Sequence, residues 1–198
     1  SPPPPSPPPP APPADPPSLP PPGVFFDRGA LYHALDEYAS SRESTIATHG
    51  PIAFWDVSFL VNAREIFQYR TTFNDDISNW DTSRVTDMLH MFRGATAFNQ
   101  PVNFDTSRVT DMYGMFRDAT AFNQPVLFDT SKVVNMQNMF NGASAFNQPL
   151  NFDVQNPVKQ LTSIFAGNNF SDTNKLLIKC AWGHTGTDEA FLFFLVRE

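Results

Sequence analysis

Residues 98–101 read Phe-Asn-Gln-Pro, and the same four residues recur at 122–125 and 146–149, so that successive copies lie 24 residues apart. A looser copy, Phe-Asn-Asp-Asp, occupies residues 73–76. A tandem period of this length is typical of solenoids, in which a unit buries its apolar face only against its neighbours. The period therefore predicts a class of fold, although it does not identify a ligand.

The repeats align into apolar columns that predict a stacked core. The columns are Trp80, Phe104, Phe128 and Phe152; Val85, Val109, Val133 and Val158; Met88, Met112, Met136 and Leu161; and Phe67, Phe92, Phe116, Phe140 and Phe165. Within one unit, a helical spacing is followed by a period of two, which predicts a short helix and a short strand. We expect an α/β repeat: a right-handed, leucine-rich-repeat-like solenoid of about five 24-residue coils over residues 52–170.

The segments that flank the repeats differ from them in composition. Residues 1–22 contain most of the 20 prolines and predict a stiff polyproline II tail, because proline fixes φ and keeps the preceding residue extended. Residues 23–51 predict an N-terminal cap with a helix near residues 30–40. Residues 171–198 predict a C-terminal cap, with a helix over 172–182 and an apolar element over 189–196.

The bulk composition excludes several classes of function. The 198-residue chain has a net charge of −7 and no run of Lys or Arg, which argues against nucleic acid and anionic membranes as partners. No apolar stretch is long enough to span a membrane. Cys180 is the single cysteine, so no internal disulfide can form. We favour a buried thiol in the cap, with an intermolecular bridge as the alternative.

Polar residues also form columns, and each column has two interpretations. An asparagine column is expected to bond one coil to the next, or alternatively to bind a ligand. An aspartate column is expected to shape Asp-Thr-Ser turns, or alternatively to bind calcium, which needs six to eight converging oxygens. A basic column is expected to pair with these aspartates, or alternatively to bind an anion. The columns are Asn74, Asn99, Asn123 and Asn147; Asp56, Asp81, Asp105, Asp129 and Asp153; and Arg84, Arg108, Lys132 and Lys159.

Residues that could support catalysis are scattered. His33, His49, His90 and His184 fit no metalloprotease, nucleophile-elbow or phosphate-loop motif. His184 follows Cys180 closely, but a Cys/His pair also needs an orienting partner and a cleft. The sequence predicts no catalytic, cofactor-binding or metal-binding residues, and therefore no enzyme and no cofactor. A deep polar pocket near His184 would revive the enzyme hypothesis.

The repeat unit resembles that of the BspA-like leucine-rich repeat surface proteins. The resemblance is carried by Trp-Asp-Thr-Ser at residues 80–83, Val-Thr-Asp-Met at 85–88, Met-Phe at 91–92 and Phe-Asn-Gln at 98–100. It covers about residues 52–170, and the flanks at residues 50–52 and 174–178 look like algal and other protist members. The resemblance implies an extracellular or cell-surface protein with interaction or adhesion roles and no enzymatic activity.

The N-terminal tail resembles the extensin-type hydroxyproline-rich glycoproteins of plants and green algae. The resemblance is carried by the two Ser-Pro-Pro-Pro-Pro blocks at residues 1–5 and 6–10. It implies hydroxyproline and O-linked sugar at Ser1, Pro2, Pro3, Pro4, Pro5, Ser6, Pro7, Pro8, Pro9 and Pro10. Independently, Asn169-Phe170-Ser171 is a sequon, so Asn169 is a candidate N-glycosylation site.

Two functions follow from these patterns. The first is an extracellular structural glycoprotein that self-assembles into a fibril, a surface appendage or a cell-wall or coat component. Its partners would be copies of itself, covalent glycans and other extracellular proteins, and its tail would dock on a neighbouring copy as polyproline II segments dock in aromatic grooves. The alternative is a cell-surface adhesion module that binds a foreign protein or glycan, with the tail as a rigid stalk.

Overall fold

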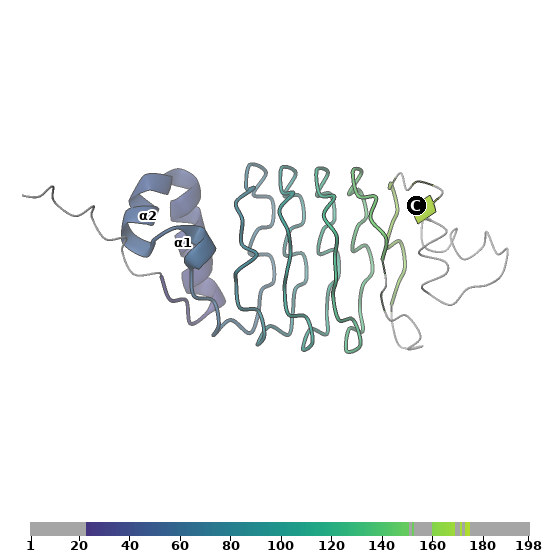
Figure 1. The fold of residues 1–198 in the computed structure, drawn as a ribbon, viewed down its shortest axis with the longest axis horizontal. Coiled ribbons are helices and arrows are strands. Elements are labelled where there is room, and N and C mark those ends of the chain that lie inside the picture. The colour runs from purple at the N-terminus through teal and green to yellow at the C-terminus, as the bar shows by residue number, and fades with distance from the viewer. Residues whose placement is uncertain (1–22, 151, 153–159, 169–170, 172, 175–198) are drawn as a thin grey trace, which may run out of the picture.

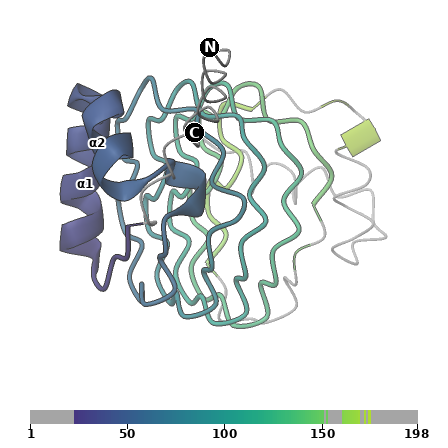
Figure 2. The ribbon, with the colours of Figure 1, turned by 60° about the vertical axis from the view of Figure 1, so that its left-hand side comes forward.

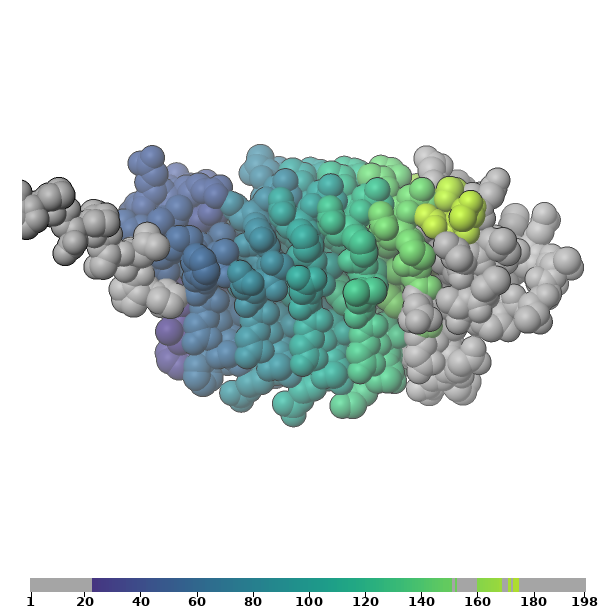
Figure 3. All heavy atoms as spheres, viewed as in Figure 1, coloured from purple at the N-terminus to yellow at the C-terminus, as the bar shows by residue number. Residues whose placement is uncertain are grey.

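The computed structural model of the protein describes residues 23–150, 152, 160–168, 171 and 173–174. Two helices, α1 (Arg28–Ser40) and α2 (Arg42–His49), and the 3-10 helix η1 (Ile52–Phe54) gather at one end. The repeats follow as loops stacked side by side along the long axis (Figure 1). Their side chains form adjoining rows in the space-filling view (Figure 3).

Neighbouring repeats are joined by parallel bridges that all follow one column. The bridges link Asn62 to Asp87, Asp87 to Asp111, Asp111 to Asn135, and Asn135 to Gln160. In the described part of the repeats these bridges are isolated, and turns occupy the positions between them. The short strand and short helix that we predicted for each unit are therefore not formed there.

The reason is a left-handed backbone at two positions in each repeat, four residues apart. Glu65 and Tyr69 have φ of 61° and 56°, and His90 and Gly94, one repeat later, have φ of 54° and 66°. A residue with positive φ interrupts both a right-handed helix and a strand. The apolar residues spaced three and four apart, which resemble one face of a helix, are therefore the buried residues of a turn.

This turn lets each repeat donate four backbone hydrogen bonds to the next. The amides of Met88, His90, Phe92 and Gly94 donate to the carbonyls of Asp111, Tyr113, Met115 and Arg117, with N–O distances of 2.7 to 2.9 Å. Equivalent bonds join the repeats before and after this pair. All of them run in one direction, so these amides point toward the C-terminal repeats and the carbonyls toward the N-terminal helices.

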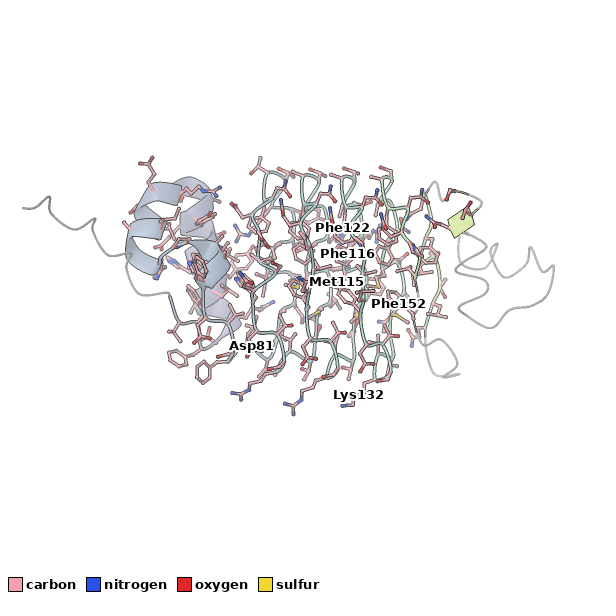
Figure 4. All side chains as sticks on the ribbon, in the orientation of Figure 1. Asp81, Met115, Phe116, Phe122, Lys132 and Phe152 are labelled. Carbon is pink, nitrogen blue, oxygen red and sulfur yellow. The ribbon has the colours of Figure 1, made fainter. Side chains whose placement is uncertain are left out.

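Phenylalanine rings stack inside the repeats in two parallel columns. Phe92 and Phe116 are stacked with centroids 5.4 Å apart and planes 2° from parallel, and Phe116 also packs 4.0 Å from Phe122 of the second column. Figure 4 shows Met115, Phe116 and Phe122 in the interior. Among the described residues the predicted apolar columns are confirmed: members such as Val109, Met112 and Phe116 are fully buried and Leu161 is partly buried, while Val158 lies outside the described residues.

The helices close the N-terminal end of the stack (Figure 2). The predicted helix near residues 30–40 is α1. Asp27 is its N-cap, and the Asp27 carboxylate accepts the Ala30 amide at 2.9 Å. Leu31 and Leu35 bury one face of α1, and the Phe25 ring packs 4.8 Å from Trp55. Helix α2 was not predicted, because its sequence is polar and short.

Arginines bind the carbonyls that the first repeat directs toward the helices. The Arg28 guanidinium donates to the Arg64 carbonyl at 3.1 Å, and that of Arg70 donates to the Ile66 carbonyl at 3.0 Å. Arg70 also pairs with Asp36 of α1 at 2.7 Å. At this end of the ladder, carbonyls that would otherwise accept from a preceding repeat accept from arginine side chains.

We predict that Phe116→Ala lowers the free energy of unfolding by about 3–5 kcal/mol, because the ring is fully buried, stacks within its own column and packs against Phe122 of the second column. Urea denaturation followed by circular dichroism measures the change. Leu127→Ala is the control: Leu127 is 93% exposed, so its truncation should change the stability by about 0.5 kcal/mol or less. Equal effects of the two variants would contradict the assignment of the stability to the stacked rings.

Candidate functional site

The aspartate column shapes turns, as we predicted. Asp81 and Asp105 each accept the backbone amide of the serine two residues later, Ser83 and Ser107, at 3.0 Å. Hydrogen bonding by each serine, first from its side chain and then from its backbone amide, holds the pKa of both carboxyls below its ordinary value of 3.8. Among the described residues, no group of three or more His, Cys, Asp or Glu side chains could hold a metal ion.

The predicted pairing of the basic column with the aspartates is not found at Asp81 and Asp105 within the described part of the chain. Neither Arg84 nor Arg108 forms an ion pair with Asp81 or Asp105, because those carboxylates are held by serine amides. Lys132 points away from the repeats at the edge where Asp81 lies (Figure 4).

The asparagine column is an internal ladder, as we predicted. The side-chain oxygen of Asn99 accepts the Asn123 amide at 2.9 Å, and that of Asn123 accepts the Asn147 amide at 2.9 Å. The glutamine column supports it, because the Gln148 amide donates to both oxygens of Asn123 at 3.0 and 3.1 Å. Beyond the last Phe-Asn-Gln-Pro copy, Asn174 replaces the glutamine: its side-chain amide donates to Asn147 Oδ1 at 2.9 Å.

The repeats leave one surface whose residues are not needed by this framework. Over the bridges, four positions of each repeat face outward, and we call this surface the ladder face: residues 64, 65, 68 and 69; 89, 90, 93 and 94; 113, 114, 117 and 118; and 137, 138, 141 and 142. The Met and Phe side chains between these positions are fully buried. Residue types change from repeat to repeat on this face, which contains Tyr, His, Arg, Asp, Asn and Gly.

Rings lie flat over glycines on the ladder face. A Cβ atom on Gly94 would be 2.5 Å from Tyr69 Cδ1, and one on Gly114 would be 2.6 Å from His90 Cδ2. The Tyr113 ring lies 5.1 Å from that of His90, at 64°. Gly94 and Gly114 therefore leave room for the rings of Tyr69 and His90, and the Tyr113 ring meets that of His90 edge-on.

Polar groups adjoin these rings. The Arg93 guanidinium lies 5.4 Å from the centroid of the Tyr69 ring. Asn138 donates to the Tyr113 hydroxyl at 3.2 Å, and Asn141 donates to Asn138 Oδ1 at 3.0 Å. The face thus combines flat rings with planar amides and guanidinium groups.

Three nitrogens on the ladder face are buried but have no hydrogen-bond partner within the described residues: His90 Nε2, Arg93 Nε and Arg117 Nε. Arg117 Nε lies 3.4 Å from the Asp118 carboxylate, which is an ionic contact without hydrogen-bond geometry. The pKa of His90 is lowered, first by burial and then by the positive charge of Arg93.

A second surface lies beside the N-terminal end. The Phe26 and Phe59 rings contact each other with centroids 4.9 Å apart and are 67% and 41% exposed. The Arg84 guanidinium lies 5.9 Å from the Phe59 ring. We call Phe26, Phe59 and Arg84 the aromatic patch; it begins four residues after Pro22, the last residue of the proline-rich segment.

The remaining predicted residues divide into two groups. His33 pairs with Glu37 at 3.4 Å, and His49 packs 6.0 Å from Trp55, so both belong to the helical end. Asn169, Cys180, His184, Asp153, Lys159 and the segment Ser1 to Pro10 lie outside the described residues, as does most of the predicted C-terminal cap.

Neither surface was predicted from the sequence. A usable signal for the ladder face was present: the Phe of each repeat is constant and the residue before it is always Met or Ile, while the positions on either side of this pair vary. The aromatic patch had a weaker signal, because Phe26 and Phe59 are far apart in the chain and outside the regular columns.

One of three comparisons with known proteins gives a match. A sequence-family profile described as "Mycoplasma protein of unknown function, DUF285" matches residues 36–127 and, in a second overlapping match, residues 90–177. No curated protein and no solved structure matches the chain. Among the described residues, no helix is both long and apolar enough to cross a membrane.

We predict that Asn123→Ala destabilises the protein by about 1–3 kcal/mol, because it leaves the Asn147 amide without its acceptor. Asn123→Asp retains an acceptor oxygen and should lose less. Thermal or urea unfolding measures both, and an alanine variant as stable as the wild type would show that the ladder is replaceable by water.

We predict that Asp105→Asn reduces the loss of stability at acidic pH. A carboxyl whose pKa is lowered on folding stabilises the native state above its ordinary pKa of 3.8, and that contribution is lost as the pH falls through the lower native value. The asparagine oxygen still accepts the Ser107 amide but does not titrate. Urea unfolding between pH 2 and 6 tests this, and parallel curves for both proteins would contradict it.

Proposed function

This chain belongs to the DUF285 family, and we propose that it is an extracellular structural glycoprotein that assembles with copies of itself. The match is consistent with the resemblance to BspA-like repeat surface proteins. We further propose the algal or protist type of that family, an extensin-like tail modified with hydroxyproline and sugar, a right-handed solenoid and no enzymatic activity. The assembly would be a fibril, a surface appendage or part of a cell wall or coat.

The observation that carries this proposal is the aromatic patch. Its rings are exposed, whereas every phenylalanine of the two stacked columns is buried. Polyproline II segments bind in shallow grooves lined by aromatic side chains, where they lose little conformational entropy. The sequence predicts such a segment at residues 1–22, and Phe26 with Phe59 would receive the segment of a neighbouring copy.

The residues of the repeats support a structural role. The Phe, Met and Asn columns and the Asp-Ser turns are used to join one repeat to the next. A rod of such units is stiff because each repeat contacts its neighbours over its whole length. These features suit a building block better than a catalyst.

The test compares assembly of the full chain with that of two variants, all produced in a host that hydroxylates and glycosylates proline. Deletion of residues 1–22 and the double variant Phe26→Ala/Phe59→Ala should each abolish assemblies seen by sedimentation velocity and electron microscopy. Leu127→Ala is the matched control, because it removes an exposed apolar side chain away from the patch. Assembly that survives both changes, or a monomeric full chain at high concentration, would contradict the proposal.

The second candidate function is recognition of a foreign protein or glycan, and the ladder face favours it. Repeat proteins bind partners over surfaces where residues vary on a regular scaffold. Under this hypothesis the tail is a stalk, so ligand binding should survive deletion of residues 1–22. Loss of ligand binding when residues 1–22 are deleted would contradict this hypothesis.

A further inference from the structure

We propose that the ladder face binds an acidic saccharide chain, whose carboxylate or sulfate groups are held by Arg93 and Arg117 and whose rings lie on Tyr69, His90 and Tyr113. This inference rests on the recognition function proposed for the same face. It assigns the chemical class of the ligand and the residues that select it.

The first argument is the set of unpaired nitrogens. His90 Nε2, Arg93 Nε and Arg117 Nε are each buried without a hydrogen-bond partner in the described structure. A buried donor without a partner costs about 1–3 kcal/mol, and more where the group is charged. Three such groups on one face of two adjoining repeats call for acceptor oxygens from outside the chain. Carboxylates and sulfates supply these oxygens in the planar arrangement that a guanidinium prefers.

The second argument is the local sign of the charge. Arg93 forms no ion pair with a described residue; its charge instead lies over the Tyr69 ring. The positive charges of Arg93, Arg117 and Arg64 all act on His90, and among the nearby charges that act on it only Glu65 opposes them. Arg64 pairs with Asp87 and Arg117 contacts Asp118, so Arg93 is the arginine of this face whose charge no described acid balances, on a chain whose net charge is −7.

The third argument is the shape of the row of rings. Aromatic side chains with a polar edge bind sugars by covering their apolar faces, and the Tyr69 side chain is 57% exposed. Tyr69, His90 and Tyr113 come from three successive repeats, although from different positions within the repeat, since Tyr69 aligns with Gly94 and His90 with Gly114. Successive repeats are spaced like the Phe92 and Phe116 rings, whose centroids lie 5.4 Å apart, which is comparable to the length of one sugar residue. A linear saccharide along the stack would thus meet one repeat per residue, as a globular ligand would not.

Asparagines would complete the site. Asn138 and Asn141 continue the row beyond Tyr113 and are already hydrogen-bonded to each other at 3.0 Å. Their remaining donor and acceptor positions suit the hydroxyl groups of a sugar. The glycines under the rings, Gly94 and Gly114, keep this surface flat because a Cβ atom at either would strike the ring above it.

The experiment measures binding of the full chain to two probes by calorimetry: oligogalacturonate, and the same oligosaccharide with its carboxylates fully methyl-esterified. We expect the acidic probe to bind, the ester to bind at least tenfold more weakly, and added salt to weaken binding. Arg93→Gln/Arg117→Gln should lower the affinity for the acidic probe at least tenfold, because it removes two charge-assisted contacts.

Two variants control for net charge and for folding. Arg108→Gln/Lys132→Gln removes the same charge from exposed residues at the edge where the Asp-Thr-Ser turns lie, and should change the affinity by less than twofold. Tyr69→Ala should weaken binding of the acidic probe severalfold while urea unfolding shows that the variant remains folded, because Tyr69 is largely exposed.

The outcomes separate this inference from the function beneath it. Equal loss in both double-glutamine variants would show non-specific charge attraction and overturn the assignment. Equal binding of the ester, lost in Tyr69→Ala, would overturn the acidic ligand class while the recognition function stands. Failure of the full chain to bind either saccharide would overturn the inference, and recognition of a protein would then be tested with the same variants.

Discussion

The ladder of backbone hydrogen bonds between repeats is the interaction on which the rest of the structure depends. Most of its bonds run toward the C-terminal repeats, and amides such as Thr110 and Ala121 donate in the opposite direction, to Thr86 and Thr96. Each repeat donates four amides to the next, and it does so from a turn that contains two left-handed residues. No helix or strand in the described repeats supplies backbone pairing of its own, so a single unit would leave these groups to water. Folding of one repeat therefore requires its neighbours, as the tandem arrangement implies.

The stacked phenylalanines add the apolar half of the same constraint. Rings 5.4 to 6.0 Å apart, such as Phe92 with Phe116 and Phe98 with Phe122, stay stacked only if the repeats keep a constant rise. The ladder imposes that rise, because its N–O distances are uniform. Hydrogen bonding and ring packing thus require the same distance between successive repeats. We expect inserted residues only in loops where neither the ladder nor the ring columns are disturbed.

The same constraint separates structural from variable residues. Side chains that point inward or along the stack are used to join repeats, as Asn123 and Asp105 show. Side chains that point outward over the ladder are free to vary, and there Tyr69, His90 and Arg93 gather. At the N-terminal end, Arg28 and Arg70 terminate the ladder while Phe26 and Phe59 remain exposed. The two surfaces proposed to bind partners are therefore those that the repeating framework leaves available.

The sequence alone determined which residues are buried and which polar columns join the repeats, because both depend only on position within a 24-residue period. Phe116 and Met112 are fully buried, Asn99 bonds to the next repeat, and α1 forms where its apolar spacing indicates. Tertiary structure alone decided the backbone of the repeats: spacing of three and four residues resembles a helix, but contacts with the neighbouring repeats hold non-glycine residues such as His90 in the left-handed region. It also decided the ladder face and the aromatic patch, since Tyr69 with Gly94 and Phe26 with Phe59 meet only after the chain has folded.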